Sequence, residues 1–516
     1  MRLVSYFAAL LLVGCGSCDG ERAQHVTPPK PPIAVPGDGE AAGASQLAPP
    51  IDAEYPHALG FLDAPPGTLD GFFGGLAAAE RAAQDGDSLG SVTRGRAAQD
   101  GDSLGSVTRG RDDGGARALM LFFGDSHTAG DSMTSRLRVA WQSRFGDAGR
   151  GLVAAGRPPT RHYYQRDVRY GRTGDWTAAV GGAHGAANVE PFGIAGLRVS
   201  GRGKGAQLYV ETCPDCQAGQ SVSQFEILYY AAPDHGIVRY RVDDGAWVDL
   251  PTKTSAIEPP HPGRQVVPVV DGPHRLTLEH GGGGQVDLFG IVMERQRPGV
   301  IVDSLGVVGR RLGSLRSWDW SIIGEQLSTR DPRLVVLQYG TNEADDPDLV
   351  LDDLAKYYDE TILRIRAAAP TASILILGPP DMGVREGGKG CDKLAAAHPD
   401  AGVTPECEWR TPGVLGEIIA VEHAAAVRNH VAFFDTFAAM GGNDQMGAWA
   451  TAEPRVAFKD RVHFTDLGYQ RWADALTGAL LDDYERWKKA QGLPPSARPA
   501  TPPPAVTTDA PLPATP

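Results

Sequence analysis

The chain has 516 residues, of which 42% are hydrophobic and 22% are charged. That length and composition can support a sizeable core and two folded domains. The formal net charge is −14, which argues against a nucleic-acid partner because an acidic surface is repelled by phosphates.

The N-terminus combines one arginine with a twelve-residue apolar run, Leu3 to Gly14. The run is shorter than the roughly 20 residues that span a bilayer, and it is typical of a signal peptide over 1–14. LVGC, ending at Cys15, resembles the bacterial lipobox, which implies cleavage before Cys15 and acylation of its thiol. The alternative is an ordinary signal peptide with a chance cysteine. With a lipobox, we expect acyl chains to anchor the protein to a membrane surface.

Two segments have compositions that do not support a packed core. Residues 27–50 are rich in Pro, Gly and Ala, and the tail 491–516 is rich in Pro, Ala and Thr. We expect a disordered tether over 15–66 and a disordered tail, because neither can bury enough surface to offset its ordering entropy. After the tether, residues 68–83 are predicted to form an amphipathic helix.

A fifteen-residue segment, RAAQDGDSLGSVTRG, occurs at 81–95 and again without change at 96–110. Two copies are too few for a solenoid, so we predict a duplicated loop at 81–110. Each copy contains Gly-Asp-Ser, with Ser88 and Ser103 as the serines. Neither serine follows an apolar run of strand length, which a nucleophile elbow requires.

A third Gly-Asp-Ser, ending at Ser126, has the context that the copies lack. The apolar run 118–123 predicts a strand buried on both faces, Gly124 permits a sharp turn, and the pattern over 132–145 predicts a helix. Ser126 is therefore the candidate nucleophile, and the first part of this domain is expected to span 67–150.

Residues 151–298 have a different character. From Ala206 to Arg295 the sequence alternates in the manner of β-strands, and Asp-Asp-Gly at 243–245 indicates a hairpin. Six or seven short strands with regular turns predict an inserted all-β sandwich. Whether it binds sugar or only supports a neighbouring cleft is left open by the sequence.

Two later apolar runs end in residues that can stabilise an oxyanion. The run 300–304 leads to Gly306 and Gly309, and the run 333–339 leads to Asn342. The Gly309 N–H, with Gly306 as the fallback, and the side-chain amide of Asn342 are candidate donors. The backbone N–H of Ser126 would be the third donor.

The C-terminal part supplies candidates for the base and the carboxylate. Asp460 and His463 are three residues apart, so one turn can present both on the same side. Directly after them, an apolar face from Trp472 to Trp487 predicts a long helix. Loops at the end of an α/β domain are common positions for catalytic residues.

The remaining pattern predicts a doubly wound, flavodoxin-like parallel sheet of five strands, completed over 299–490. The expected strands are at 118–123, 300–304, 333–339, 373–378 and 431–435. The expected helices are near 132–145, 349–368 and 413–429.

Other features are assigned structural or open roles. Cys213 and Cys216, and Cys391 and Cys407, are candidate disulfide pairs, since in an exported protein a disulfide is favoured over a zinc site that lacks four ligands. His127 is either a substrate contact or a structural side chain. Asp381 is a possible substrate contact, although a loop role is favoured. The basic cluster at 309–312 is interpreted as a helix start or as surface.

Together, Gly-Asp-Ser at Ser126, the glycine turn at Gly309, Gly-x-Asn at Asn342 and the Asp-x-x-His of Asp460 and His463 resemble the SGNH (GDSL) hydrolase superfamily. GDSHTAGD, YGTNEA and DRVHFT are similar to its peptidoglycan O-acetylesterase branch, which carries an inserted β-domain resembling a carbohydrate-binding module.

The resemblance implies a serine esterase without metal or other cofactor, acting on O-acetyl groups of a cell-envelope glycan. With the lipobox, it implies a lipoprotein of the bacterial envelope, on the periplasmic face of the outer membrane, with an acetylated glycan as partner. The alternatives are acetyl transfer to glycan hydroxyls, an esterase for acetyl-xylan or another polysaccharide, and a non-catalytic glycan-binding lipoprotein.

Overall fold

The computed structural model describes residues 59–89, 116–156, 163–182, 191–385 and 409–496, with helical backbone but no side-chain detail over 84–89. These residues belong to one compact unit. Within these ranges, no helix has the length and apolar character needed to cross a bilayer. The predicted tether, the tail, Ser103, Cys15, Cys391 and Cys407 lie outside the described residues.

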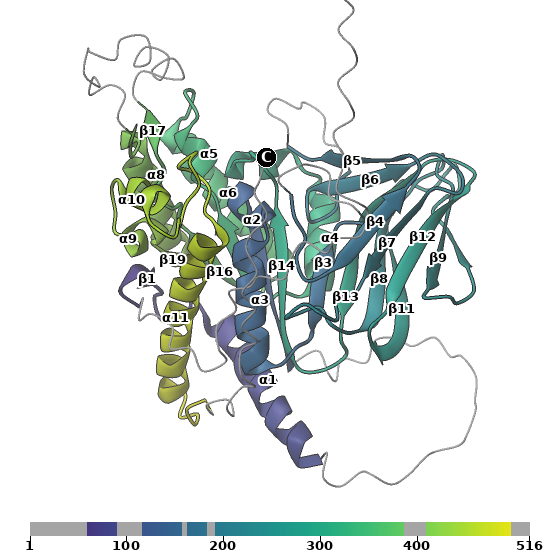
Figure 1. Ribbon diagram of the computed structural model, residues 1–516, viewed down its shortest axis with the longest axis horizontal. Helices are drawn as coiled ribbons and strands as arrows, with labels where there is room; N and C mark the ends of the chain where they lie inside the picture. Colours follow the sequence, from purple (N-terminus) through teal and green to yellow (C-terminus); the bar gives the residue numbers. More distant parts are fainter. Residues whose placement is uncertain (1–58, 90–115, 157–162, 183–190, 386–408, 497–516) are drawn as a thin grey trace, which may run out of the picture. The chain divides into compact units, whose positions relative to one another are not determined.

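A six-stranded sheet forms the centre of the α/β part, in the order β1-β19-β16-β15-β2-β14 (Figure 1). Its strands are β1 (Leu62–Asp63), β2 (Arg117–Gly124), β14 (Gly299–Gly306), β15 (Leu334–Gln338), β16 (Ser373–Leu377) and β19 (Ala432–Phe434). The last five are mutually parallel and coincide with the five predicted strands. The predicted strand number was wrong, because β1 adds an antiparallel edge beside β19. Two residues are too few to give an apolar run.

Helices cover both faces of this sheet. The helices on one side are α1 (Asp70–Leu89), α3 (Ser132–Phe145) and α11 (Asp466–Ala490), and those on the other are α4 (Trp320–Arg330), α6 (Leu351–Ala368) and α8 (Gly413–Asn429). Successive residues of β2 point to opposite faces, so Phe122 packs with the first group and Leu121 with the second. An α/β domain is therefore confirmed.

The predicted loop at 81–110 needs correction at its start. Helix α1 continues to Leu89 and includes Ser88, so the first part of the first copy is helical. The Ala, Glu, Arg and Gln residues of α1 are good helix formers, and α1 extends the helix predicted over 68–83. Ser88 lies near the end of a helix and not after a strand, so it lacks the setting of a nucleophile elbow.

The inserted region forms two stacked sheets with a shared apolar core. One has the order β10-β9-β12-β7-β4, and the other β11-β8-β13-β6-β5 with β3 beside β13. The strands are β3 (Gly149–Val153), β4 (Arg169–Thr173), β5 (Trp176–Val180), β6 (Leu197–Gly201), β7 (Gln207–Glu211), β8 (Val222–Ala231), β9 (Ile237–Val242), β10 (Val248–Pro251), β11 (His261–Gly272), β12 (Arg275–Gly282) and β13 (Val286–Glu294).

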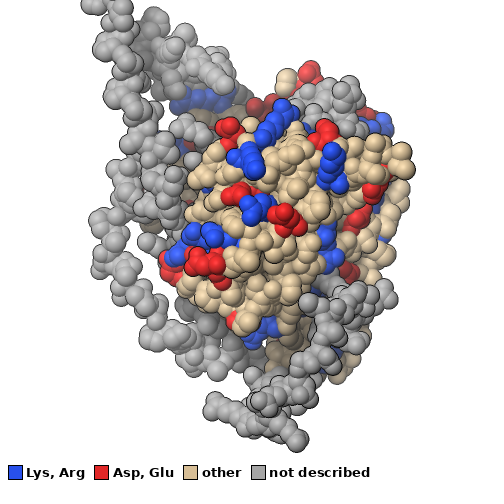
Figure 2. Space-filling view, turned by 90° about the vertical axis from the view of Figure 1, so that its right-hand side faces the viewer, with Lys and Arg blue, Asp and Glu red and all other residues tan. Residues whose placement is uncertain are grey.

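A β-sandwich is present. The alternating region from Ala206 to Arg295 contains seven strands, β7 to β13, within the predicted number, and β3 to β6 precede it without having been predicted. The hairpin predicted at 243–245 joins β9 to β10. Figure 2 shows basic and acidic side chains interleaved on the insert side of the molecule. Several pair across strands, including Arg239 with Asp249 and Glu279, as is usual for a solvated sheet face.

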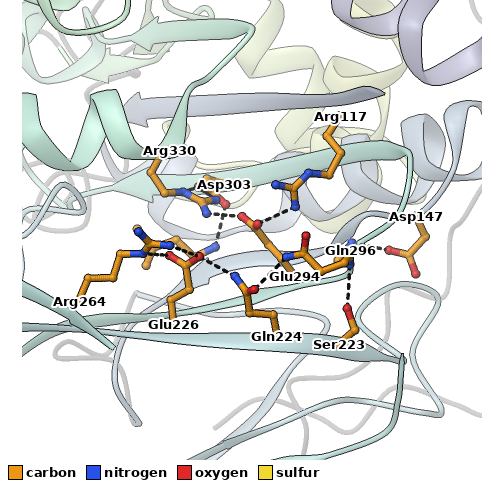
Figure 3. A network of polar contacts seen from close by, with 12 residues as sticks. Arg117, Asp147, Ser223, Gln224, Glu226, Arg264, Glu294, Gln296, Asp303 and Arg330 are labelled. Carbon is orange, nitrogen blue, oxygen red and sulfur yellow. Dashed lines mark hydrogen bonds and ion pairs between the residues drawn. The ribbon is translucent and has the colours of Figure 1, made fainter. Parts of the chain in front are cut away.

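A polar network joins the sandwich to the α/β sheet (Figure 3). Glu294 at the end of β13 is paired with Arg117 of β2 at 3.0 Å and also with Arg330 of α4. Arg330 reaches Asp303 of β14 at 2.6 Å. Because Glu294, Arg330 and Asp303 are almost fully buried and charges of both signs are present, the network holds the two parts in register.

The shorter elements connect these layers. They are η1 (Leu59–Phe61), α2 (Ser126–Ala129), η3 (Leu312–Ser317), α5 (Thr341–Ala344), β17 (Val384–Arg385), β18 (Trp409–Arg410), α9 (Thr436–Met440) and α10 (Gln445–Thr451). Helices α2 and α5 follow β2 and β15 directly, so both begin at the carboxyl edge of the parallel sheet, where open α/β sheets carry their sites (Figure 1).

Candidate active site

Ser126 occupies the first position of α2, immediately after the turn that ends β2. The Asp125 carboxylate caps this helix by accepting the N–H of His127 at 2.9 Å. Gly124 permits the turn, since a Cβ there would lie 2.2 Å from Thr128 Oγ1. Thr128 Oγ1 donates in turn to Gln338 at the end of β15. The serine is thus held by a strand, a tight turn and a capped helix. The sequence predicted the strand and the turn, but it placed the next helix at 132–145, which is α3, and did not predict α2.

Ser126, His463 and Asp460 form a continuous hydrogen-bonded line. His463 Nε2 lies 2.9 Å from Ser126 Oγ, and His463 Nδ1 lies 2.8 Å from Asp460 Oδ2. The other Asp460 oxygen accepts the backbone N–H groups of Val462 and His463, which fixes the turn between the two residues. Serine and imidazole are 337 positions apart in the chain and meet within hydrogen-bond distance. This is the arrangement of a nucleophile, a base and a carboxylate that orients the base.

The pKa values of Asp460 and His463 favour a base that is held in one orientation. Burial alone would raise the pKa of Asp460, but hydrogen bonds from the His463 ring and from two backbone N–H groups outweigh it, and the pKa falls to about 2. The same hydrogen bond raises the pKa of His463, against the opposing effect of its partial burial. At neutral pH Asp460 is therefore an anion that accepts the Nδ1 proton, and Nε2 faces the serine.

Asn342 lies in α5, which follows β15, and Gly309 lies in the loop that follows β14, at the same edge of the sheet. Asn342 Nδ2 donates to the Arg310 carbonyl at 3.0 Å. An amide nitrogen has two N–H groups, so one holds the side chain in place and the other is available to a ligand. Gly309 is exposed and has a φ of 70°, a conformation that suits glycine.

Gly306, the fallback candidate, lies where the chain is closely packed. It ends β14 opposite Gly124, and a Cβ there would lie 2.1 Å from the backbone nitrogen of Ala129. The close packing of α2 against β14 therefore requires glycine at this position.

Side chains that were not predicted to have a role connect the loop after β14 to helix α5. Glu343, 2% exposed, accepts the backbone N–H of Leu312 at 2.8 Å and that of Gly340 at 2.9 Å. Arg311 donates to the Asn342 carbonyl at 3.0 Å and pairs with Asp346. The basic cluster at 309–312 does precede a helix start, since η3 begins at Leu312 with Arg311 at its N-cap, and Arg311 also contacts the Asn342 backbone. The signal for Glu343 was its place in the first turn of a short helix, where glutamate caps backbone N–H groups.

His127 is fully buried, so of the two roles left open by the sequence the structure favours a structural side chain over a substrate contact. Its Nδ1 lies 3.1 Å from the Tyr469 hydroxyl, and its ring centroid is 5.4 Å from that of His463. Burial holds the pKa of His127 well below its ordinary value, so the ring is neutral. Phe464 and Trp472 complete an aromatic cluster behind the base. His127 is a packing residue for the base.

Asp381 is also buried, and its two oxygens accept the Thr411 hydroxyl at 2.6 Å and the Met446 N–H at 2.7 Å. It holds a loop, as favoured from the sequence. Cys213 and Cys216 form the predicted disulfide. Among the described residues, these cysteines and Asp215 make the group whose spacing would suit a metal ion, but the disulfide occupies both thiols.

Comparison with known proteins supports this geometry. Residues 271–471 match the model of the GDSL-like lipase/acylhydrolase family. The matched range includes Gly309, Asn342, Asp460 and His463 but begins after Ser126. The position of Ser126 beside these residues therefore rests on the structure and not on this match. A search of curated proteins found no match.

Among solved structures, one described as "Peptidoglycan O-acetylesterase in action, 5 min" has a TM-score of 0.56 and 25% sequence identity, covering 72% of this chain and 92% of its own. An acetyl xylan esterase has a TM-score of 0.25 and 17% identity, covering 35% of this chain and 80% of its own. A family two carbohydrate esterase from Cellvibrio japonicus has a TM-score of 0.23 and 10% identity, with coverages of 61% and 98%. TM-scores as low as the last two support no functional inference. The family match over residues 271–471 and the first likeness, together with the geometry described above, support an SGNH (GDSL) hydrolase domain that resembles the peptidoglycan O-acetylesterase branch.

Proposed function

We propose that this carboxylic ester hydrolase removes O-acetyl groups from a cell-envelope glycan, with peptidoglycan as the foremost substrate. The observation that carries the proposal is the line from Asp460 through His463 to Ser126, with contacts of 2.8 and 2.9 Å. The likeness to a peptidoglycan O-acetylesterase over 72% of this chain supports the choice of substrate.

The reaction follows from the proposed roles of these residues. Asp460 keeps the proton on Nδ1 of His463, so the Nε2 lone pair takes the Ser126 proton as the oxygen attacks the acetyl carbonyl. The oxyanion is met by the N–H groups of Ser126 and Gly309 and by the amide of Asn342. His463 then protonates the sugar oxygen as it leaves. Water, activated by the same imidazole, releases acetate from the acyl-enzyme.

We further propose that the chain is exported and held on the envelope membrane by acylation of Cys15. The apolar run before LVGC supports this proposal. Such an anchor followed by a tether would leave the esterase within reach of the cell wall, and the inserted β-sandwich would lie beside the bound glycan. Radiolabelled palmitate incorporated by the wild type and not by Cys15→Ala would support the anchor, and equal labelling would contradict it.

Acetate release tests the substrate. Purified protein is incubated with O-acetylated peptidoglycan and, separately, with acetylated xylan, with Ser126→Ala as the control. We expect faster release from peptidoglycan and none above background from the variant. Preference for xylan would assign a different polysaccharide. Formation of an acetylated glycan from an added acceptor, without free acetate, would indicate acetyl transfer. The absence of reaction with any ester would favour the non-catalytic, glycan-binding alternative.

A further inference from the structure

A cavity of about 520 Å³ lies beside helix α5, which carries Asn342. Its walls come from η3, from the segment that follows α5 and from the first turns of α6, with Gly182 of the insert at one side. The volume is within the range of small-molecule sites. Nothing in the proposed acetyl chemistry needs this space, since an acetyl group is far smaller.

The cavity borders the loop after β14 and helix α5, which carry the candidate oxyanion donors Gly309 and Asn342. Two of its wall residues, Arg311 and Glu343, are those that position helix α5. Arg311 contacts the Asn342 carbonyl, and Glu343 is its next neighbour in the chain. The cavity therefore lies next to the elements that carry the candidate oxyanion donors.

Several of the polar side chains that line the cavity already have a hydrogen-bond or ion-pair partner within the protein. Arg311 pairs with Asp346, Asp353 pairs with Lys356 at 3.1 Å, and Ser317 donates to the Ser314 carbonyl. Asp348 differs: its carboxylate is exposed, and within the described part of the chain it makes no ion pair. It is an open acceptor at the cavity, suited to hydroxyl or amide donors.

An aromatic ring completes the lining. Tyr357 has the Arg316 guanidinium 4.5 Å from its ring centroid, and Gly313 leaves room for the ring, because a Cβ there would lie 3.0 Å from Tyr357 Cε2. Leu349 and Val350 add apolar surface. An aromatic side chain beside carboxylate acceptors and apolar atoms matches a sugar ring, which has C–H faces and a rim of hydroxyl donors.

The charge of the wall narrows the class of sugar. The lining contains Glu343, Asp346, Asp348 and Asp353 but one basic residue, Arg311, which is paired. Such a surface repels carboxylates and accepts neutral donors. It therefore favours an uncharged pyranose, such as an N-acetylhexosamine, over a uronic acid.

We propose that this cavity is a subsite for the neutral sugar next to the acetylated residue, so that the enzyme acts on glycan chains in preference to isolated acetyl sugars. The inference rests on the proposed function and names a substrate feature that the acetyl chemistry alone does not require. Asp348 accepts hydrogen bonds from that sugar, and Tyr357 packs against it.

The test uses O-acetylated chito-oligosaccharides of one to five sugars, with 4-nitrophenyl acetate as a small ester. For the full-length wild type, kcat/KM is expected to rise with chain length and then level off. Asp348→Asn is expected to lose about 3- to 10-fold in kcat/KM on the trisaccharide, the effect of one hydrogen bond, and to leave the small ester unchanged. Tyr357→Ala is expected to lower the chain-length gain in the same way.

Asp345→Asn is the matched control, because Asp345 is also exposed, lies on the same segment and does not line the cavity. Equal effects of Asp345→Asn and Asp348→Asn would overturn the proposal. So would a kcat/KM independent of chain length in the wild type, or a preference for oligosaccharides oxidised to carboxylates. Failure of the proposed function looks different: turnover of 4-nitrophenyl acetate with no acetate released from a sugar of any length.

Discussion

Replacing Asp460 by asparagine tests the electrostatic part of the mechanism. Asp460 Oδ1 accepts two backbone N–H groups, at 3.0 and 3.1 Å, and an amide oxygen can keep both contacts. The amide nitrogen then occupies the place of Oδ2, which lies 2.8 Å from His463 Nδ1. An N–H donor there requires Nδ1 to be the acceptor, so the ring proton moves to Nε2. His463 then presents a proton to Ser126 and cannot take one.

The size of the effect has two parts. The pKa of Asp460 falls from 3.8 to about 2, and each pKa unit corresponds to about 1.4 kcal/mol. Because half of the Asp460 side chain is exposed, screening by solvent reduces this coupling to roughly 1–2 kcal/mol. The pKa of His463, which the hydrogen bond with Asp460 raises, should therefore drop in Asp460→Asn. The wrong tautomer should lower kcat by about 10³- to 10⁴-fold.

The assay is the pH profile of kcat/KM with 4-nitrophenyl acetate. In the wild type, activity is expected to rise with pH through the raised pKa of His463, because the base must be neutral. In Asp460→Asn, the rise in activity is expected at lower pH. The plateau value of kcat/KM is expected to be far lower than in the wild type. Asp466→Asn is the control, since Asp466 is equally exposed and pairs with Arg166. An unchanged acid limb in Asp460→Asn, or the same shift in Asp466→Asn, would refute the reasoning.

Three further variants test separate parts of the account. Asn342→Ala should lower kcat by about 10²- to 10³-fold with little change in KM, and a loss confined to KM would contradict an oxyanion role. Glu343→Ala should lower both kcat and the melting temperature, with partial recovery in Glu343→Gln, because an amide keeps one acceptor; normal kcat in the alanine variant would count against it. Glu294→Ala should lower the free energy of unfolding by about 3–5 kcal/mol, since it leaves Arg330 buried without this partner. The half-buried Glu485, which pairs with Arg144, is the comparison, and Glu485→Ala should cost about 1 kcal/mol or less in urea unfolding; equal losses would be the contrary result.

The sequence allowed the sheet and the catalytic candidates to be predicted because each has a local signal. An apolar run before Gly124 specifies the strand and turn that present Ser126, and the three-residue spacing of Asp460 and His463 specifies one turn. The long parallel strands are buried on both faces and appear as continuous apolar runs.

The supporting contacts have no such signal. Arg311 acts through the Asn342 carbonyl, and Glu343 through two backbone N–H groups, so their partners are backbone atoms that any residue would supply. His127 looks polar in the sequence, yet the fold surrounds it with aromatic rings from α11 and the preceding loop. Strand β1 is held by pairing with β19, which lies more than 360 residues away in the chain. These features depend on tertiary contacts.

The most direct measurement of the central claim is the site of reaction with a serine-directed fluorophosphonate, mapped by mass spectrometry of the intact chain and its peptides. The account predicts one adduct, on Ser126, whose rate of formation collapses in His463→Ala and is unchanged in Ser88→Ala and Ser103→Ala. An adduct on Ser88 or Ser103, or labelling of Ser126 at the wild-type rate without the imidazole of His463, would contradict it.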